Sequence, residues 1–243
     1  MADVRLCAIV PTFDNPLTIR QTVKAVRNYV EHVIVVDDGS GEDAAQIVRS
    51  LAGMGVIQLI RHPTNCGKGA AVKTGLKAAH FLGFTHALQI DADGQHHFED
   101  IPKFIELAHL YPTCCIVAQP IFDASAPFHR RAFRWLTRFW VCIEVGDDRI
   151  GDPMCGFRVY PVEAALRTGA FSNRMEFDIE VAVRLAWAGM RFVHVPSPVR
   201  YLKPEEGGVS HWRVFRDTWL LSKMHTRLMI EKVSGWLKRF TME

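Results

Sequence analysis

The chain has 243 residues, of which 49% are hydrophobic and 23% are charged, a composition typical of a globular protein with an extensive core. Its 29 Lys and Arg against 26 Asp and Glu leave a formal net charge of +3, which excludes a strongly basic nucleic-acid coat and an acidic disordered tail. No apolar run approaches the roughly 20 residues of a membrane span, and the N-terminus lacks the apolar core of a signal peptide. The six cysteines lack zinc-type spacing. We therefore expect a cytoplasmic protein with reduced thiols.

The first half of the chain alternates short apolar runs, rich in Val and Ile, with amphipathic stretches. The runs predict strands at residues 6–10, 33–36, 56–60, 87–90 and 115–118. The stretches between them predict helices at residues 17–29, 44–51, 70–81 and 101–110. Strands separated by helices of this length predict an α/β fold with a Rossmann-like, mostly parallel central sheet and helices on both faces.

The second half is less regular. Its expected elements are helices at residues 133–144 and 179–188, a stretch punctuated by Gly and Pro at 151–161, a strand at 192–195 and a long helix from Trp212. We interpret residues 1–210 as one domain, and residues 211–243 as an amphipathic, basic helical segment of the same domain.

Polar residues follow three of the predicted strands, at 11–14 (Pro-Thr-Phe-Asp), 37–40 (Asp-Asp-Gly-Ser) and 91–95 (Asp-Ala-Asp-Gly-Gln). Ligands of open parallel sheets bind beyond the carboxyl ends of the strands, so these segments predict a site at one edge of the sheet. Taken alone, residues 37–40 are more typical of a capped turn between a strand and a helix.

Asp91 and Asp93 are expected to converge on one point. At about 4 Å and an effective dielectric constant of about 20 their repulsion is roughly 4 kcal/mol, so a positive charge should lie between them or one carboxyl should be protonated. Carboxylate oxygens favour Mg²⁺ or Mn²⁺, to which Gln95 could add a carbonyl oxygen. The alternative is a solvated turn with Asx hydrogen bonds. We expect the adjacent His96 and His97 to be solvated rather than to bind metal.

Residues 65–69 (Asn-Cys-Gly-Lys-Gly) precede a predicted helix, as phosphate-binding loops do. The segment is not a Walker A loop, since His62 stands in place of the first Gly and Gly69 in place of Ser or Thr. It is not a complete dinucleotide fingerprint either, since Val72 stands in place of the third Gly. A dinucleotide site stays a weaker alternative, beside a plain glycine turn.

Between residues 7 and 217, these elements in order resemble the inverting family 2 glycosyltransferases, above all the branch of dolichol-phosphate mannose and glucose synthases. The matching segments are residues 10–13, 35–40, 65–69, 91–96, 156–158 (Gly-Phe-Arg), 176–180 (Glu-Phe-Asp-Ile-Glu) and 208–211 (Gly-Val-Ser-His). The resemblance implies that residues 1–210 form a catalytic domain with a glycosyltransferase-A fold. It also implies a UDP- or GDP-sugar donor and Mg²⁺ or Mn²⁺.

The resemblance further implies roles for individual residues. Those that would hold the nucleotide are Pro11, Thr12, Asp14, Asp38, Lys68, Asp91 and Ala92. Asp91, Asp93 and Gln95 would hold the metal and the diphosphate, with Asp93 needed for catalysis, because a cation neutralises the charge of the leaving group. Asp178 stands where related enzymes place their base. An alcohol acceptor would need that base and a phosphate acceptor would not; Asp178 could equally be a structural carboxylate at a helix N-terminus.

The chain departs from the family pattern on the acceptor side. Residues 118–120 read Ala-Gln-Pro where polyprenyl-phosphate enzymes have Gly-Ser-Arg, so the acceptor phosphate would fall to Arg130, Arg131 or Arg158. His211 replaces a Lys, and it would either ligate the metal or cap the last helix. The pattern resembles uncharacterised bacterial members found alongside fatty-acid and aryl-polyene pigment synthesis, which leaves open a lipid acceptor other than polyprenyl phosphate.

Two predicted helices carry the cations and aromatic residues of a membrane-surface protein. Arg130, Arg134 and Arg138 form one stripe, and Trp, Lys and Arg share a face of the segment after Trp212. This combination suits the headgroup layer of a bilayer. We expect peripheral attachment to the inner face of the membrane; the alternative is a solvated basic face.

The sequence therefore predicts a metal-dependent, inverting glycosyltransferase that moves a sugar from a nucleotide sugar to a lipid or polyprenyl-phosphate acceptor, with no nucleic-acid partner. The alternatives are a dinucleotide-dependent oxidoreductase and a catalytically inactive, membrane-binding scaffold. The missing third Gly argues against the first, and the presence of Lys68, Asp91 and Asp93 argues against the second.

Overall fold

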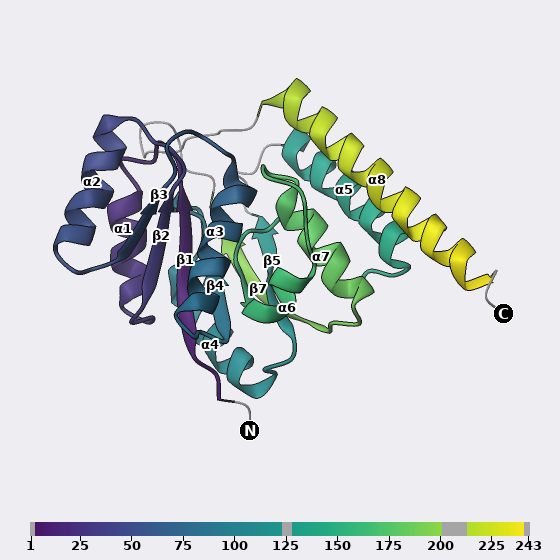
Figure 1. Ribbon diagram of the computed structural model, residues 1–243, viewed down its shortest axis with the longest axis horizontal. Coiled ribbons are helices and arrows are strands. Elements are labelled where there is room, and N and C mark those ends of the chain that lie inside the picture. The colour runs from purple at the N-terminus through teal and green to yellow at the C-terminus, as the bar shows by residue number, and fades with distance from the viewer. Residues whose placement is uncertain (1–2, 123–127, 201–212, 241–243) are drawn as a thin grey trace.

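The structure, a computed structural model, describes residues 3–122, 128–200 and 213–240. Within them lies a sheet of seven strands in the order β3-β2-β1-β4-β6-β5-β7 (Figure 1). The strands are β1 (Leu6–Thr12), β2 (Val33–Asp37), β3 (Gln58–Arg61), β4 (His86–Gln89), β5 (Cys115–Phe122), β6 (Arg158–Pro161) and β7 (Phe192–Val199). Every neighbouring pair is parallel except those of β6, which runs antiparallel to β4 and β5. The predicted mostly parallel sheet is confirmed.

Helices cover both faces of this sheet. They are α1 (Ile19–Arg27), α2 (Glu42–Gly53), α3 (Lys68–Phe81), α4 (Ile101–Leu110), α5 (Phe128–Val145), α6 (Val162–Arg167), α7 (Phe177–Trp187) and α8 (Val214–Phe240), with a short 3₁₀ helix at Phe98–Asp100. Ala8 and Val10 of β1 pack with residues of α1, α2 and α4, whereas Cys7 and Ile9 pack with residues of α3, α6 and α7. Since successive strand side chains point to opposite faces, a strand buried on both faces reads as a continuous apolar run.

The helices α5 and α8 form a further layer, side by side at one end of the molecule (Figure 1). Leu221, Met224 and Leu228 of α8 are buried in a third apolar cluster, together with Val141 of α5 and Ile179 of α7. The helix α7 therefore lies between the sheet and the α5–α8 pair. No helix among the described residues is long and apolar enough to cross a membrane.

Two short elements in the second half were not expected from the sequence. The strand β6 falls inside the stretch punctuated by Gly and Pro, and α6 follows it directly. The side chains of Arg158 and Tyr160 in β6 are fully buried although both are polar, so no apolar run marks the strand. A four-residue strand with this composition gives no periodic signal.

Candidate active site

The carboxyl ends of β1, β2 and β4 meet at one edge of the sheet, as predicted. Thr12 pairs with Asp37 in the sheet register, and the Asp38 amide donates to the Thr12 carbonyl at 2.8 Å. Asp14 joins the same edge because its Oδ1 accepts the amide of Gly41 at 2.8 Å, while its own amide donates to the hydroxyl of Ser40 at 2.9 Å. The loops after β1 and β2 are therefore tied into one wall.

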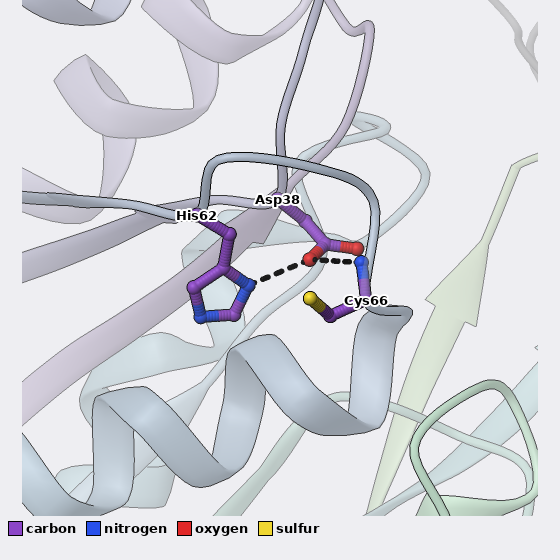
Figure 2. Close-up of side chains that lie close together, drawn as sticks. All are labelled: Asp38, His62 and Cys66. Atoms are coloured by element: carbon purple, nitrogen blue, oxygen red, sulfur yellow. Dashed lines mark hydrogen bonds and ion pairs between the residues drawn. The ribbon is translucent and has the colours of Figure 1, made fainter.

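Asp38 organises the loop that precedes α3 (Figure 2). Its Oδ1 accepts the amide of Cys66 at 3.0 Å and its Oδ2 the amide of Gly67 at 2.7 Å. The Nδ1 atom of His62 lies 2.7 Å from Oδ1 of Asp38. A Cβ at Gly39, whose φ is +78°, would lie 2.5 Å from the backbone of Thr64, so only Gly allows the two loops to approach this closely.

Lys68, at the start of α3, bridges two carboxylates. Its Nζ lies 2.8 Å from Oδ1 of Asp91, beyond β4, and 2.8 Å from Oδ2 of Asp178, on α7. Burial alone would lower the pKa of Lys68, but the charges of Asp178 and Asp91 raise it overall. Burial alone would raise the pKa of Asp91, but Lys68 and then His96 lower it overall. Both groups are therefore charged at neutral pH.

Asp93 has the opposite electrostatic environment. Burial and the negative charge of Asp91 raise its pKa, and the amide of Gln95 donates to its Oδ1 at 3.0 Å. The positive charge of Lys68 lowers the pKa of Asp93, but this effect is smaller than the increase caused by burial and by Asp91. The raised pKa means that a second positive charge would be stabilised here, and an oxygen-only donor set suits Mg²⁺ or Mn²⁺. The residues present therefore fit a hard divalent cation.

Asp178 is held from both sides at the N-terminus of α7, with only 3% of the residue exposed. Its Oδ1 accepts the side-chain amide of Gln89 at 3.0 Å, while its Oδ2 faces Lys68. Gln89 in turn accepts the hydroxyl of Tyr160 at 3.1 Å. The positioning of Asp178 thus depends on Gln89 and Tyr160. Neither residue was predictable from the sequence, because strand residues that face a core form no recognisable motif.

Arg158 does not face solvent. Its guanidinium donates to the backbone carbonyls of Pro153 at 3.0 Å and of Asp178 at 2.9 Å, and also to that of Cys155. The arginine is 1% exposed. Because these carbonyls occupy its donors, this position favours a structural role over the predicted contact with an acceptor phosphate.

His96 is largely buried, so the expectation that it is solvated was wrong. Its side chain is 7% exposed, its ring packs against Phe157, and its Nε2 lies 3.8 Å from Oδ2 of Asp91. Its Nδ1 is buried without a hydrogen-bond partner among the described residues. His97, in contrast, is exposed as expected.

The remaining predicted residues are distributed as follows. Pro11 and Ala92 are buried, and the carbonyl of Ala92 accepts the hydroxyl of Thr18 at 2.6 Å. Arg131 is exposed on α5. The side chain of Arg130 and all of His211 lie outside the described residues, so their predicted roles stay predictions.

The chain is similar in sequence to a known protein family and to named members of it. Residues 7–167 match the family model described as Glycosyl transferase family 2. Over 120 residues the chain is 33% identical to the UDP-N-acetylglucosamine--dolichyl-phosphate N-acetylglucosaminyltransferase of Methanococcus voltae, a match that covers 44% of this chain and 48% of that protein. Over 202 residues it is 24% identical to the undecaprenyl-phosphate mannosyltransferase of Micrococcus luteus, covering 79% of this chain and 82% of that protein.

Solved structures with the same fold include glucosyl-3-phosphoglycerate synthase from Mycobacterium tuberculosis in complex with Mn²⁺, uridine diphosphate and phosphoglyceric acid. That chain superposes with a TM-score of 0.69 at 15% identity, covering 95% of this chain and 79% of that one. At this identity the likeness concerns the fold alone. The predicted glycosyltransferase-A fold is confirmed.

Proposed function

Because the chain belongs to glycosyl transferase family 2, we propose that it is a divalent-cation-dependent, inverting glycosyltransferase that moves a sugar from a nucleoside diphosphate to a lipid phosphate. The prediction of a glycosyltransferase is confirmed by the family. The observation that carries the finer proposal is the ion-pair cluster of Asp91, Lys68 and Asp178, with Asp93 beside it at the strand ends.

We assign the nucleotide to the wall formed by the loops after β1 and β2. Thr12 and Asp14 border it, and Asp38 shapes it by holding the amides of Cys66 and Gly67. A relative whose name includes a UDP-sugar donor supports UDP in this place. The donor is a UDP- or GDP-sugar.

Asp91 and Asp93 would hold Mg²⁺ or Mn²⁺, with Gln95 and His211 as further candidate ligands. When bound, such a cation neutralises the charge that develops on the departing nucleoside diphosphate. The raised pKa of Asp93 supports this assignment. Burial and the charge of Asp91 destabilise the ionised form of Asp93, and a bound cation would stabilise it. Lys68 adds a fixed positive charge beside the same carboxylates.

The surroundings of Asp178 support a phosphate acceptor over an alcohol. A general base needs a lone pair within reach of the proton it takes, and it works best when that lone pair is free. One oxygen of Asp178 is bound to Lys68 and the other to Gln89. A phosphate oxygen is already anionic and attacks without a base. In this proposal Asp178 orients Lys68 and removes no proton.

The exposed faces of α5 and α8 support a lipid acceptor at a membrane surface. Large apolar side chains of α5 are exposed at Trp135, Leu136, Phe139, Trp140 and Ile143, and those of α8 at Trp219, Ile230 and Val233. A groove of about 410 Å³ separates the two helices, and residues from both line it. Exposed aromatics beside basic residues suit an interfacial position, on the inner face of the membrane.

The predicted basic stripe contributes less to this surface than the sequence suggested. Arg134 is paired with Asp152 at 2.8 Å, and Nε of Arg138 donates to Asp148 at 2.7 Å. These acidic partners lie 18 and 10 residues further along the chain, respectively, so the helix sequence alone did not reveal them. Paired arginines attract an anionic surface weakly, and the proposed attachment therefore depends mainly on the aromatic residues.

The two earlier alternatives have no specific support in the structure. The family excludes assignment of the chain to the dinucleotide-dependent oxidoreductases, and Lys68, Asp91 and Asp93 are arranged as a charged site rather than dispersed. Membership of the bacterial branch found with aryl-polyene synthesis stays a prediction, as does a lipid acceptor outside the polyprenyl phosphates.

The test is a transfer assay with radiolabelled UDP- and GDP-sugars and vesicles that contain either a polyprenyl phosphate or the matching polyprenol. We expect transfer to the phosphate, none to the alcohol, and loss of transfer in EDTA. Asp93→Asn serves as the control against contaminating enzymes. Transfer that survives EDTA, or that prefers the alcohol, would overturn the proposal.

A further inference from the structure

Resting on the nucleotide site proposed above, we propose that Asp38, His62 and Cys66 form a Zn²⁺ site whose occupation excludes the nucleotide. One ligand atom from each residue lies within 4.8 Å of the other two (Figure 2). The three come from separate places in the sequence: the end of β2, the segment after β3 and the loop before α3. The fold, not a local motif, brings them together.

The donor set of this cluster differs from that of the Asp91–Asp93 pair. It offers one carboxylate oxygen, one imidazole nitrogen and one thiolate sulfur. Mg²⁺ and Mn²⁺ prefer oxygen, whereas Zn²⁺ binds sulfur and nitrogen and often keeps a fourth position for water or another ligand. The chain therefore has two neighbouring cation sites with different preferences.

His62 is already oriented as a ligand. Its Nε2 lies 2.9 Å from the hydroxyl of Thr74, a contact that fixes the ring and leaves Nδ1 facing Asp38 at 2.7 Å. Metal-binding histidines are typically oriented by such a bond from the other ring nitrogen. In the metal-free structure Nδ1–H donates to Oδ1 of Asp38, because a carboxylate oxygen only accepts, and Nε2 accepts the hydroxyl of Thr74. Metal binding selects the other neutral tautomer, in which the proton lies on Nε2 and is donated to Thr74, so that Nδ1 presents a lone pair to the cluster.

Binding of Zn²⁺ would replace two hydrogen bonds: that between Nδ1 of His62 and Asp38, and that from the thiol of Cys66 to the carbonyl of Thr64 at 3.4 Å. In the tautomer that binds, Nδ1 carries no proton, and the thiol of Cys66 loses its proton to solvent as the Zn–S bond forms. Tetrahedral coordination with bonds of about 2.1 Å separates the nitrogen and the oxygen by about 3.4 Å, so Nδ1 and Oδ1, now 2.7 Å apart, need to move apart by about 0.7 Å. Asp38 keeps the amides of Cys66 and Gly67.

The site is both preorganised and accessible. The loop backbone is fixed by the hydrogen bonds that the amides of Cys66 and Gly67 donate to Asp38, and by its close approach to Gly39. The side chain of Cys66, in contrast, is exposed. Because the same loop forms part of the wall assigned to the nucleotide, a cation on Asp38 and Cys66 occupies space that the donor needs. Excess Zn²⁺ therefore inhibits the enzyme competitively with the donor.

The test uses Co²⁺ as a probe for Zn²⁺, because a thiolate bound to Co²⁺ gives an ultraviolet charge-transfer band that oxygen ligands do not give. We expect the band in the wild-type chain, its displacement by Zn²⁺, and its loss in both Cys66→Ser and His62→Gln. Cys142→Ser removes a different, partly exposed thiol and should keep the band. Circular dichroism of each variant separates loss of the site from loss of the fold.

Competition is measured separately, by adding uridine diphosphate with Mg²⁺ to the Co²⁺-loaded chain. We expect the band to fall as the nucleotide binds, and the inhibition by Zn²⁺ to weaken at least tenfold in Cys66→Ser. A missing band, or a band unchanged in Cys66→Ser, would overturn the metal site. A band that persists beside bound nucleotide would overturn the exclusion, whereas failure of uridine diphosphate to bind the metal-free chain would count against the proposed function instead.

Discussion

Lys68 is the residue on which the charge balance of the site depends. It is the shared partner of Asp91 and Asp178, both of which lie in poorly solvated positions. Removing one member of a buried ion pair leaves the other charge uncompensated, which typically costs more than the pair contributes. The residue thus has a structural role before any nucleotide arrives.

We predict that Lys68→Met lowers the free energy of unfolding by about 3 kcal/mol and that Mg²⁺ restores part of the loss, because a cation at Asp91 and Asp93 replaces the missing charge. Urea unfolding with and without Mg²⁺ measures both effects. Lys77→Met, at an exposed position of the same helix, is the matched control and should change the stability by less than about 0.5 kcal/mol. Equal losses at the two positions would contradict the role of Lys68.

Asp93 has a distinct signature because its pKa is raised by burial and by Asp91. The folded chain therefore binds the Asp93 proton more tightly than the unfolded chain. Its contribution makes the free energy of unfolding fall as the pH rises from the ordinary Asp range through the raised pKa.

We predict that Asp93→Asn removes this fall. In EDTA, the variant should gain stability relative to the wild type as the pH rises from about 4 to about 7, whereas turnover should drop by about 10²–10³-fold because the developing negative charge loses its counter-charge. Chemical denaturation at several pH values and the transfer assay measure the two. Glu106→Gln, at an exposed position of α4, should leave both unchanged.

At the scale of elements, the sequence predicted most of the parallel half and less of the rest. The helix expected at residues 101–110 was found with those bounds, because its apolar residues recur at helical spacing. The strand expected at 56–60 begins two residues later, at Gln58. The antiparallel β6 was missed, since Arg158 and Tyr160 are polar residues whose burial depends in part on hydrogen bonds to Asp178 and Gln89, which are distant in sequence.

The candidate site divides in the same way. Asp91, Asp93 and Lys68 were predictable because they follow strands or begin a helix in a recognisable pattern. The contacts that orient them, such as Gln89 with Asp178, join residues 89 positions apart and leave no trace in local sequence. The same limit explains the arginine stripe, whose acidic partners are in another segment.

The exposed face of α5 leads to a prediction about membranes. Replacing Trp135 and Phe139 by Ser should weaken binding to anionic vesicles at least tenfold, because burial of one large apolar side chain contributes about 1.5–3 kcal/mol. Phe81→Ser is the control, since Phe81 is 90% exposed but lies at the end of α3. Sedimentation with vesicles at low and high salt provides the measurement. Binding that salt alone abolishes would instead favour the basic residues.

For the molecule as a whole, ligand binding should increase the free energy of unfolding. A ligand that binds only the folded chain raises the free energy of unfolding by about 2.7 kcal/mol when its concentration is 100 times its dissociation constant. We predict such an increase for uridine diphosphate with Mn²⁺ and none with EDTA. Thermal unfolding across a concentration series measures it. Equal stabilisation in EDTA would contradict a metal-dependent nucleotide site.

The position of α7 has a consequence for how the two ends of the molecule communicate. Phe177 and Val181 pack towards the sheet, Ile179 and Ala182 pack in the cluster shared with α5 and α8, and Asp178 reaches the ion-pair cluster. A shift of α7 would therefore change both the ion-pair cluster and the packing of α5 and α8. Coupling between two binding events is thermodynamically reciprocal. If binding to a lipid surface changes the affinity for the donor through α7, bound donor changes the affinity for that surface by the same factor.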